Sequence, residues 1–143
     1  MKKTFSLIFA LLLPALTQAE YLTFSETWVR AVPPSSKMTA AYAKITNSSE
    51  YDIWITGAQS DSFGKVELHE TIEEDGMAKM VHQDFVKLAP GETVEFKRGG
   101  KHFMMFTPKA PIKEGDKHVI GVKLGNGDIE SFEAVVSRNA PGA

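Results

Sequence analysis

Short stretches rich in β-branched and aromatic residues recur along most of this chain, and they constrain its fold more than any other feature. Each stretch has the composition and length of a β-strand, and each ends at a turn signal. No window shows the 3.6-residue period of an amphipathic helix. The predicted strands cover residues 21–32, 40–47, 51–58, 65–72, 77–88, 93–97, 102–106, 118–124 and 129–136.

The segments between these stretches are rich in Gly, Pro, Asn and Ser, the residues that form turns. They lie at residues 33–36, 47–49, 75–76, 90–91, 99–100, 108–115 and 125–127. Seven to nine short strands at this spacing are typical of a Greek-key β-sandwich or barrel. The sequence therefore predicts one all-β domain over residues 20–137, followed by a short tail at residues 138–143.

The first 19 residues have the anatomy of a secretory signal peptide. Lys2 and Lys3 precede an apolar run over residues 5–16, and small residues follow at the expected cleavage site near Ala19. The run is shorter than the roughly 20 apolar residues that cross a bilayer. We expect export to the periplasm and no stable membrane insertion.

The chain has no cysteine, so neither a disulfide nor a lipid anchored through a thiol is available to it. It carries 16 basic and 18 acidic residues, a formal charge of -2; without Lys2 and Lys3 the balance is 14 minus 18, or -4. A mildly acidic chain without a basic cluster argues against a nucleic-acid partner. We expect a monomer that is stabilised by its hydrophobic core.

Alternation within two predicted strands places polar and sulfur-bearing side chains on one face. In residues 65–69 two apolar residues point to the core, which leaves His69 on the outer face. In residues 102–106 Phe103 and Met105 are predicted to be core residues. His102 and Met104 then share the outer face, about 6.6 Å apart along the strand.

Asp75-Gly76 is the preferred sequence for a two-residue hairpin turn. A hairpin folded there sets Met80 opposite Thr71, and it sets His82 opposite His69. Met80 is then diagonal to His69 on the outer face, about 7 to 8 Å away along the backbone.

Two imidazoles and two thioethers are thus placed as two pairs on outer faces, and the two pairs would bind one ion if those faces meet. Thioether sulfur is a poor ligand for hard ions and selects Cu(I) among biological metals. A ligand set without charge also favours a monovalent ion over a divalent one. Because the chain has no cysteine, a blue-copper thiolate site is excluded.

The spacing of these residues resembles the copper-binding signature of the periplasmic copper chaperones known as PCu(A)C. Ten residues separate His69 from Met80, twenty-one separate Met80 from His102, and one separates His102 from Met104. Further similar segments lie at residues 28–30, 41–47, 66–70 and 99–105, so that the resemblance spans nearly the whole predicted domain.

The resemblance implies a cupredoxin-like β-sandwich that binds one Cu(I) per chain through those four side chains. It also implies a copper-accepting periplasmic partner, which is either a subunit of a respiratory oxidase or a thiol-bearing copper chaperone. Members of the family often carry Met directly after the first histidine, whereas Glu70 stands here.

Several alternatives stay open at this point. The sequence does not decide whether His82 or Met77 assists the site, or whether Trp28 packs in the core or contacts the ion. The acidic residues of the hairpin are interpreted as solvated; they are Glu67, Glu70, Glu73, Glu74 and Asp75.

The alternative function is a non-catalytic ligand-binding or adhesion module with incidental His and Met residues. An enzyme is disfavoured, because the chain lacks a Gly-x-Ser-x-Gly elbow, a His-Glu-x-x-His helix and a cysteine nucleophile.

Overall fold

The computed structural model describes residues 20–143, and in them the chain forms ten β-strands and no helix. The predicted signal peptide lies outside the described residues. The strands are β1 (Leu22–Arg30), β2 (Met38–Asn47), β3 (Ile53–Gln59), β4 (Phe63–Glu74), β5 (Met77–His82), β6 (Val86–Leu88), β7 (Thr93–Phe96), β8 (Lys101–Pro108), β9 (Lys117–Leu124) and β10 (Ile129–Ser137). Residues 20–143 contain no helix long and apolar enough to cross a membrane.

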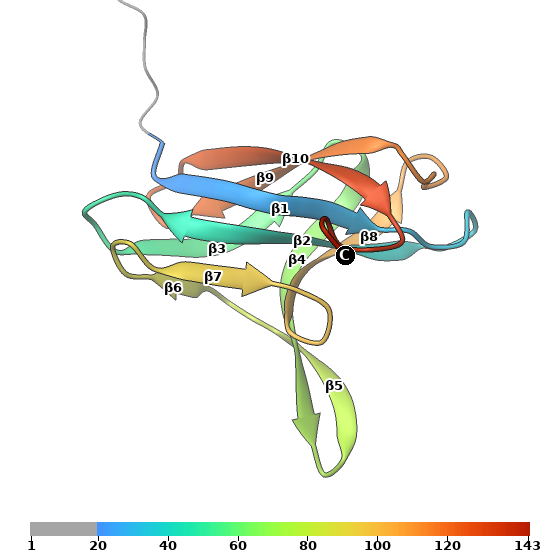
Figure 1. Cartoon of the computed structure of the whole chain (residues 1–143), viewed down its shortest axis with the longest axis horizontal. Coiled ribbons are helices and arrows are strands. Elements are labelled where there is room, and N and C mark those ends of the chain that lie inside the picture. The colour runs from blue at the N-terminus through green and yellow to red at the C-terminus, as the bar shows by residue number, and fades with distance from the viewer. Residues whose placement is uncertain (1–19) are drawn as a thin grey trace, which may run out of the picture.

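The strands form one mixed sheet that closes on itself as a barrel-like sandwich (Figure 1). Pairing runs from β4 through β8, β2, β1, β10, β9 and β3, and it returns to β4 at the Ala58–Val66 bridge. The pairs β1–β10 and β7–β8 are parallel, and the other pairs are antiparallel. The predicted all-β single domain is confirmed.

The core fills the space inside this closed sheet. Phe103 is fully buried at its centre, with ring centroids 4.4 Å from Phe96 and 5.8 Å from Phe132. Met105 is also fully buried, as alternation in β8 predicts. A smaller apolar cluster lies on the opposite face of β8; it consists of Trp28, Ala40, Tyr42 and Met104, with Phe106 packed against it.

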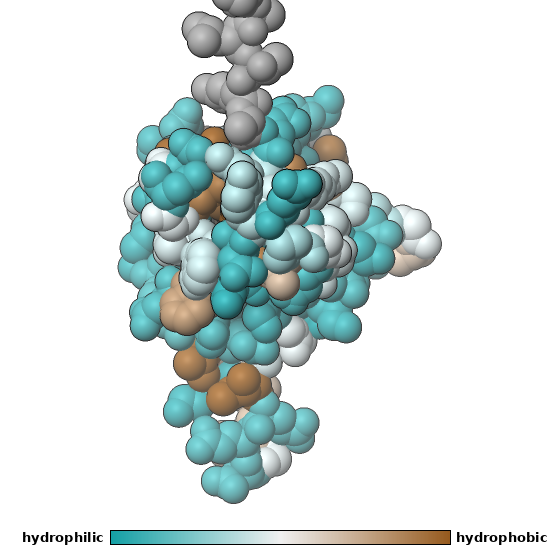
Figure 2. Space-filling view, turned by 90° about the vertical axis from the view of Figure 1, so that its left-hand side faces the viewer, coloured by the Kyte–Doolittle hydropathy of each residue, from teal (hydrophilic) through white to brown (hydrophobic). Residues whose placement is uncertain are grey.

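The hairpin of β4 and β5 extends beyond the body of the domain (Figure 1). Its turn residues Asp75 and Gly76 have φ angles of 52° and 75°, the two positive values that a type I′ turn requires. The register pairs Thr71 with Met80 and His69 with His82, as predicted. Figure 2 shows apolar surface at the neck of this projection, and the exposed hydrophobic residues of the region include Ile72 and Phe85.

The prediction of one strand over residues 77–88 is wrong, because this segment forms β5 and β6 with a break at residues 83–85. β5 pairs with β4, whereas β6 pairs with β3 through Ile53 and Leu88. The chain changes partner between the two strands. The break therefore reflects tertiary pairing rather than a local turn signal.

Candidate metal centre

Three histidines lie in one row across the neighbouring strands β5, β4 and β8. His69 on β4 pairs with His82 on one side and with His102 on the other. The centroid of the His69 ring is 5.8 Å from that of His82 and 5.8 Å from that of His102. The outer faces of β4 and β8, which the sequence analysis treats separately, are thus neighbouring parts of one sheet face.

The two methionines of the motif flank this row on opposite diagonals. Met104 pairs with Glu67, two residues before His69, and Met80 pairs with Thr71, two residues after it. Each diagonal is about 7 to 8 Å, so a flat sheet would separate the two methionines by about 15 Å. Coordination of one ion by both thioethers therefore requires the hairpin to twist or bend toward β8.

The two methionines also differ in burial. Met104 is 9% exposed and belongs to the apolar cluster beside β8, whereas Met80 is 56% exposed on the projecting hairpin. The structure therefore brings the half-buried His69 and the buried His102 and Met104 together on one face of β4 and β8. Met80 lies at the open end of the same face.

His102 presents one ring nitrogen that has no partner. Its Nδ1 donates to the carbonyl oxygen of Gly100 at 3.1 Å, since a carbonyl can only accept. The neutral ring then carries a lone pair on Nε2. That nitrogen is buried and has no hydrogen-bond partner within residues 20–143.

His69 presents the opposite nitrogen. Its Nε2 donates to the Glu67 carboxylate at 2.8 Å, which leaves the lone pair on Nδ1. This Nδ1 is likewise buried, without a partner in the described part of the chain. An unpaired buried polar atom costs about 1–3 kcal/mol, and a bound metal ion would satisfy both nitrogens. The donor chemistry therefore fits a soft metal ion.

The electrostatics of His102 favour its neutral form. Burial lowers the pKa of His102 below its ordinary value, and the nearby His69 lowers it further, against an opposing effect of the hydrogen bond to Gly100. The hydrogen bonds from His69 and Lys65 lower the pKa of Glu67, so this carboxyl group stays ionised. A neutral imidazole is the ligand form of histidine.

An aromatic wall covers the Met104 side of the group. Trp28 is 5% exposed and packs at 4.7 Å between ring centroids on Tyr42, whose pKa is raised by burial. The Arg98 guanidinium lies 5.0 Å above the Trp28 ring. Trp28 therefore packs beside Met104 as part of the outer cluster. This cluster therefore covers Met104, which is 9% exposed.

Other residues that the sequence singled out lie elsewhere. Met77 pairs with Glu74, and alternation turns it to the face of the hairpin opposite His69. The side chain of His82 is 54% exposed and lies 3.6 Å from Asp84. Over residues 20–143, no group of three or more His, Cys, Asp or Glu side chains is placed to hold a metal ion without a methionine.

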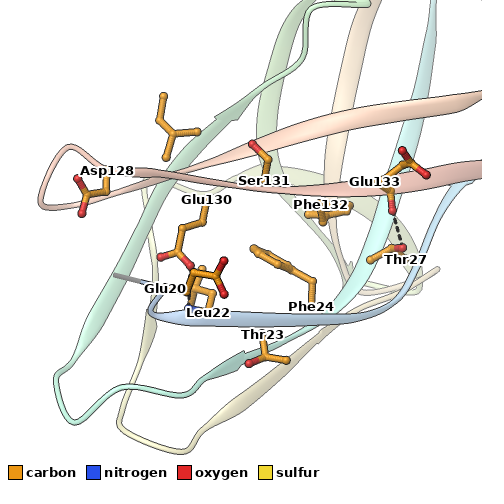
Figure 3. Close-up of a pocket in the computed structure, with 11 residues that line it drawn as sticks. Glu20, Leu22, Thr23, Phe24, Thr27, Asp128, Glu130, Ser131, Phe132 and Glu133 are labelled. Atoms are coloured by element: carbon orange, nitrogen blue, oxygen red, sulfur yellow. Dashed lines mark hydrogen bonds between the residues drawn. The ribbon is translucent and has the colours of Figure 1, made fainter. Parts of the chain in front are cut away.

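A separate groove lies between β1 and β10 (Figure 3). Phe24 and Phe132 meet inside it with ring centroids 5.0 Å apart. The Glu130 carboxylate accepts hydrogen bonds from the backbone N–H groups of Tyr21 and Leu22. This groove contains no residue of β4, β5 or β8, so it is distinct from the histidine row.

A family model and two known relatives match most of the described part of the chain. Residues 22–136 match the LpqE-like lipoprotein family. A Leifsonia xyli protein named as a lipoprotein is 30% identical over 111 residues, covering 77% of this chain and 66% of the relative. An uncharacterized Rickettsia prowazekii protein is 32% identical, covering 68% of this chain and 56% of the relative. The chain thus spans less than two thirds of the length of these relatives.

Two solved structures share the fold. The Cu(I) form of DR1885 from Deinococcus radiodurans is 33% identical, with a TM-score of 0.63 over 79% of this chain and 76% of that protein. The copper-bound PCuAC domain of PmoF2 has a TM-score of 0.69 over 86% of this chain and 97% of that domain. Its identity of 17% supports likeness of fold alone.

Proposed function

The chain belongs to the LpqE-like (PCuAC) family, and on that premise we propose that it is a non-catalytic periplasmic copper carrier. It binds one Cu(I) ion with His69, Met80, His102 and Met104. It then passes the ion to a copper-accepting periplasmic protein, either an oxidase subunit or a thiol-bearing copper chaperone.

One observation carries this proposal. His69 and His102 are cross-strand partners with ring centroids 5.8 Å apart, and each ring has a buried nitrogen without a partner among the described residues. Met104 lies beside them in a largely buried position. Two imidazoles and a thioether without a neighbouring thiolate suit Cu(I) better than harder or divalent ions. The Cu(I) form of the DR1885 relative supports the same choice of metal.

The exposed position of Met80 suits transfer of the ion. In the proposal, the hairpin folds toward His69 and completes the ligand set with an uncharged, exchangeable thioether. Thioethers do not form disulfides, so they function in an oxidising compartment. Departure of Met80 opens one side of the ion to an incoming thiolate, which is a stronger ligand for a soft metal.

A competition titration of purified protein against a colorimetric Cu(I) chelator tests this function. The wild type should bind one equivalent of Cu(I), and a Met80→Ala, Met104→Ala double variant should lose most of that affinity. Met77→Ala is the matched control, because this methionine lies on the same hairpin but on its other face. Full Cu(I) affinity in the double variant would contradict the ligand assignment and favour an incidental methionine pair.

A further inference from the structure

Glu67 fixes the orientation of the His69 ring. The two residues are two positions apart on β4, so their side chains share one face of the strand. One carboxylate oxygen accepts from His69 Nε2 at 2.8 Å, and the other lies 3.1 Å from the Lys65 ammonium nitrogen. Both carboxylate oxygens are therefore engaged, one by His69 and the other by Lys65.

The contacts of Glu67 determine the tautomer of His69. The carboxylate lies between the Lys65 ammonium group and His69 Nε2, and its oxygens can only accept. A ring nitrogen that faces an ionised carboxylate must carry the proton. Nε2 is then the N–H nitrogen, and Nδ1 keeps the lone pair.

The other nitrogen of His69 is available to a metal ion. Nδ1 is buried and lacks a partner among the described residues, while His102, the cross-strand neighbour, has its own unpartnered Nε2. We infer that Glu67 is a positioning residue, which holds His69 in the Nε2–H tautomer so that Cu(I) binds at Nδ1. This inference rests on the proposed function. It adds to that function the His69 atom that binds Cu(I), Nδ1, and the residue that leaves this atom unprotonated, Glu67.

Other metal sites indicate how much Cu(I) affinity the loss of Glu67 should cost. A carboxylate that orients a ligating imidazole fixes its tautomer and raises its basicity, and removing such a partner costs about 10- to 100-fold in metal affinity. We expect Glu67→Ala to weaken Cu(I) binding in that range. We expect Glu67→Gln to weaken it less, because the amide carbonyl still accepts from Nε2–H.

Long-range proton–nitrogen NMR of the histidine rings tests the inference directly. In apo wild-type protein His69 should show a single Nε2–H tautomer, and added Cu(I) should shift Nδ1 of His69 and Nε2 of His102. Glu67→Ala should give mixed tautomers at His69, whereas Glu67→Gln should retain the wild-type form. The matched control is Glu70→Ala, since Glu70 also pairs with a lysine but points to the other face of β4.

The outcomes separate the inference from the proposed function. A Cu(I)-induced shift at Nε2 of His69 would overturn the inference, as would a Cu(I) affinity of Glu67→Ala equal to that of Glu70→Ala. Failure of the wild type to bind Cu(I) would contradict the proposed function. In that case the tautomers of the apo proteins would still show whether Glu67 orients His69.

Discussion

His69 and His102 lie opposite each other on β4 and β8, with ring centroids 5.8 Å apart and the ring planes inclined by 56°. Each ring has one nitrogen engaged, by Glu67 or by the Gly100 carbonyl, and one nitrogen buried without a partner inside the described region. A bound metal ion would therefore find two imidazole nitrogens that are not engaged by other described residues.

The two methionines should respond differently to truncation. Met104→Ala should lower the free energy of unfolding of the apo protein by about 2 kcal/mol, because it removes a largely buried side chain next to Trp28. Met80→Ala should change it by less than about 0.5 kcal/mol, as expected for an exposed side chain. Both variants should lose Cu(I) affinity. Urea unfolding of the apo proteins and Cu(I) titration measure the two effects, and equal destabilisation by both variants would contradict the structure.

His82 should contribute little to Cu(I) binding although it lies in the histidine row. Its Nδ1 lies 3.6 Å from the Asp84 carboxylate, and the proposed ligand from β5 is Met80. We expect His82→Gln to change the free energy of Cu(I) binding by about 0.5 kcal/mol or less, like other exposed substitutions. His69→Gln should lose most of the Cu(I) affinity in the same titration. A loss of similar size in both variants would make His82 a ligand.

The hairpin turn should control the order of β5. Gly76 has a φ of 75°, where a residue with a side chain costs about 1–2 kcal/mol. Within residues 20–143, β5 pairs only with β4, so Gly76→Val should speed amide hydrogen exchange in β5 and should lower Cu(I) affinity through Met80. Asp75→Asn is the control, because Asn tolerates positive φ. Unchanged exchange in Gly76→Val would show that the turn does not hold the hairpin.

The stability of the apo protein should fall with pH below about 6.5, in part because of His102. Burial lowers the pKa of His102 in the folded state, so below the ordinary value of 6.5 the unfolded chain binds a proton that the folded chain does not. Stability then decreases as pH falls, by up to about 1.4 kcal/mol per pH unit for one such group. Urea unfolding at several pH values compares wild type with His102→Gln, which should show a shallower loss between pH 6.5 and 5. Identical slopes would contradict a lowered pKa.

Local patterns in the sequence correctly predict the fold and the face of the strand on which each side chain lies. Alternation in β8 correctly assigns Phe103 and Met105 to the core and Met104 to the outer face, because strand geometry alone decides it. The Asp75-Gly76 turn fixes the register of the hairpin for the same local reason. The family predicted from the motif spacing is confirmed by the match over residues 22–136.

Features that depend on nonlocal pairing could not be predicted. The alignment of His69 with His102 depends on the register of β4 with β8, and the break before β6 depends on β3. Trp28 approaches Met104 because β1 and β8 both pair with β2. Glu67 was interpreted as a solvated acid, although its position two residues before His69 on one face of a strand was a usable signal.

X-ray absorption spectroscopy of the Cu(I)-loaded protein tests the central claim most directly. One Cu(I) per chain should show two sulfur and two imidazole nitrogen neighbours in the wild type, and one sulfur fewer in either Met80→Ala or Met104→Ala. A first coordination shell without sulfur in the wild type, or an unchanged shell in both variants, would contradict the proposal that these residues bind a single copper ion.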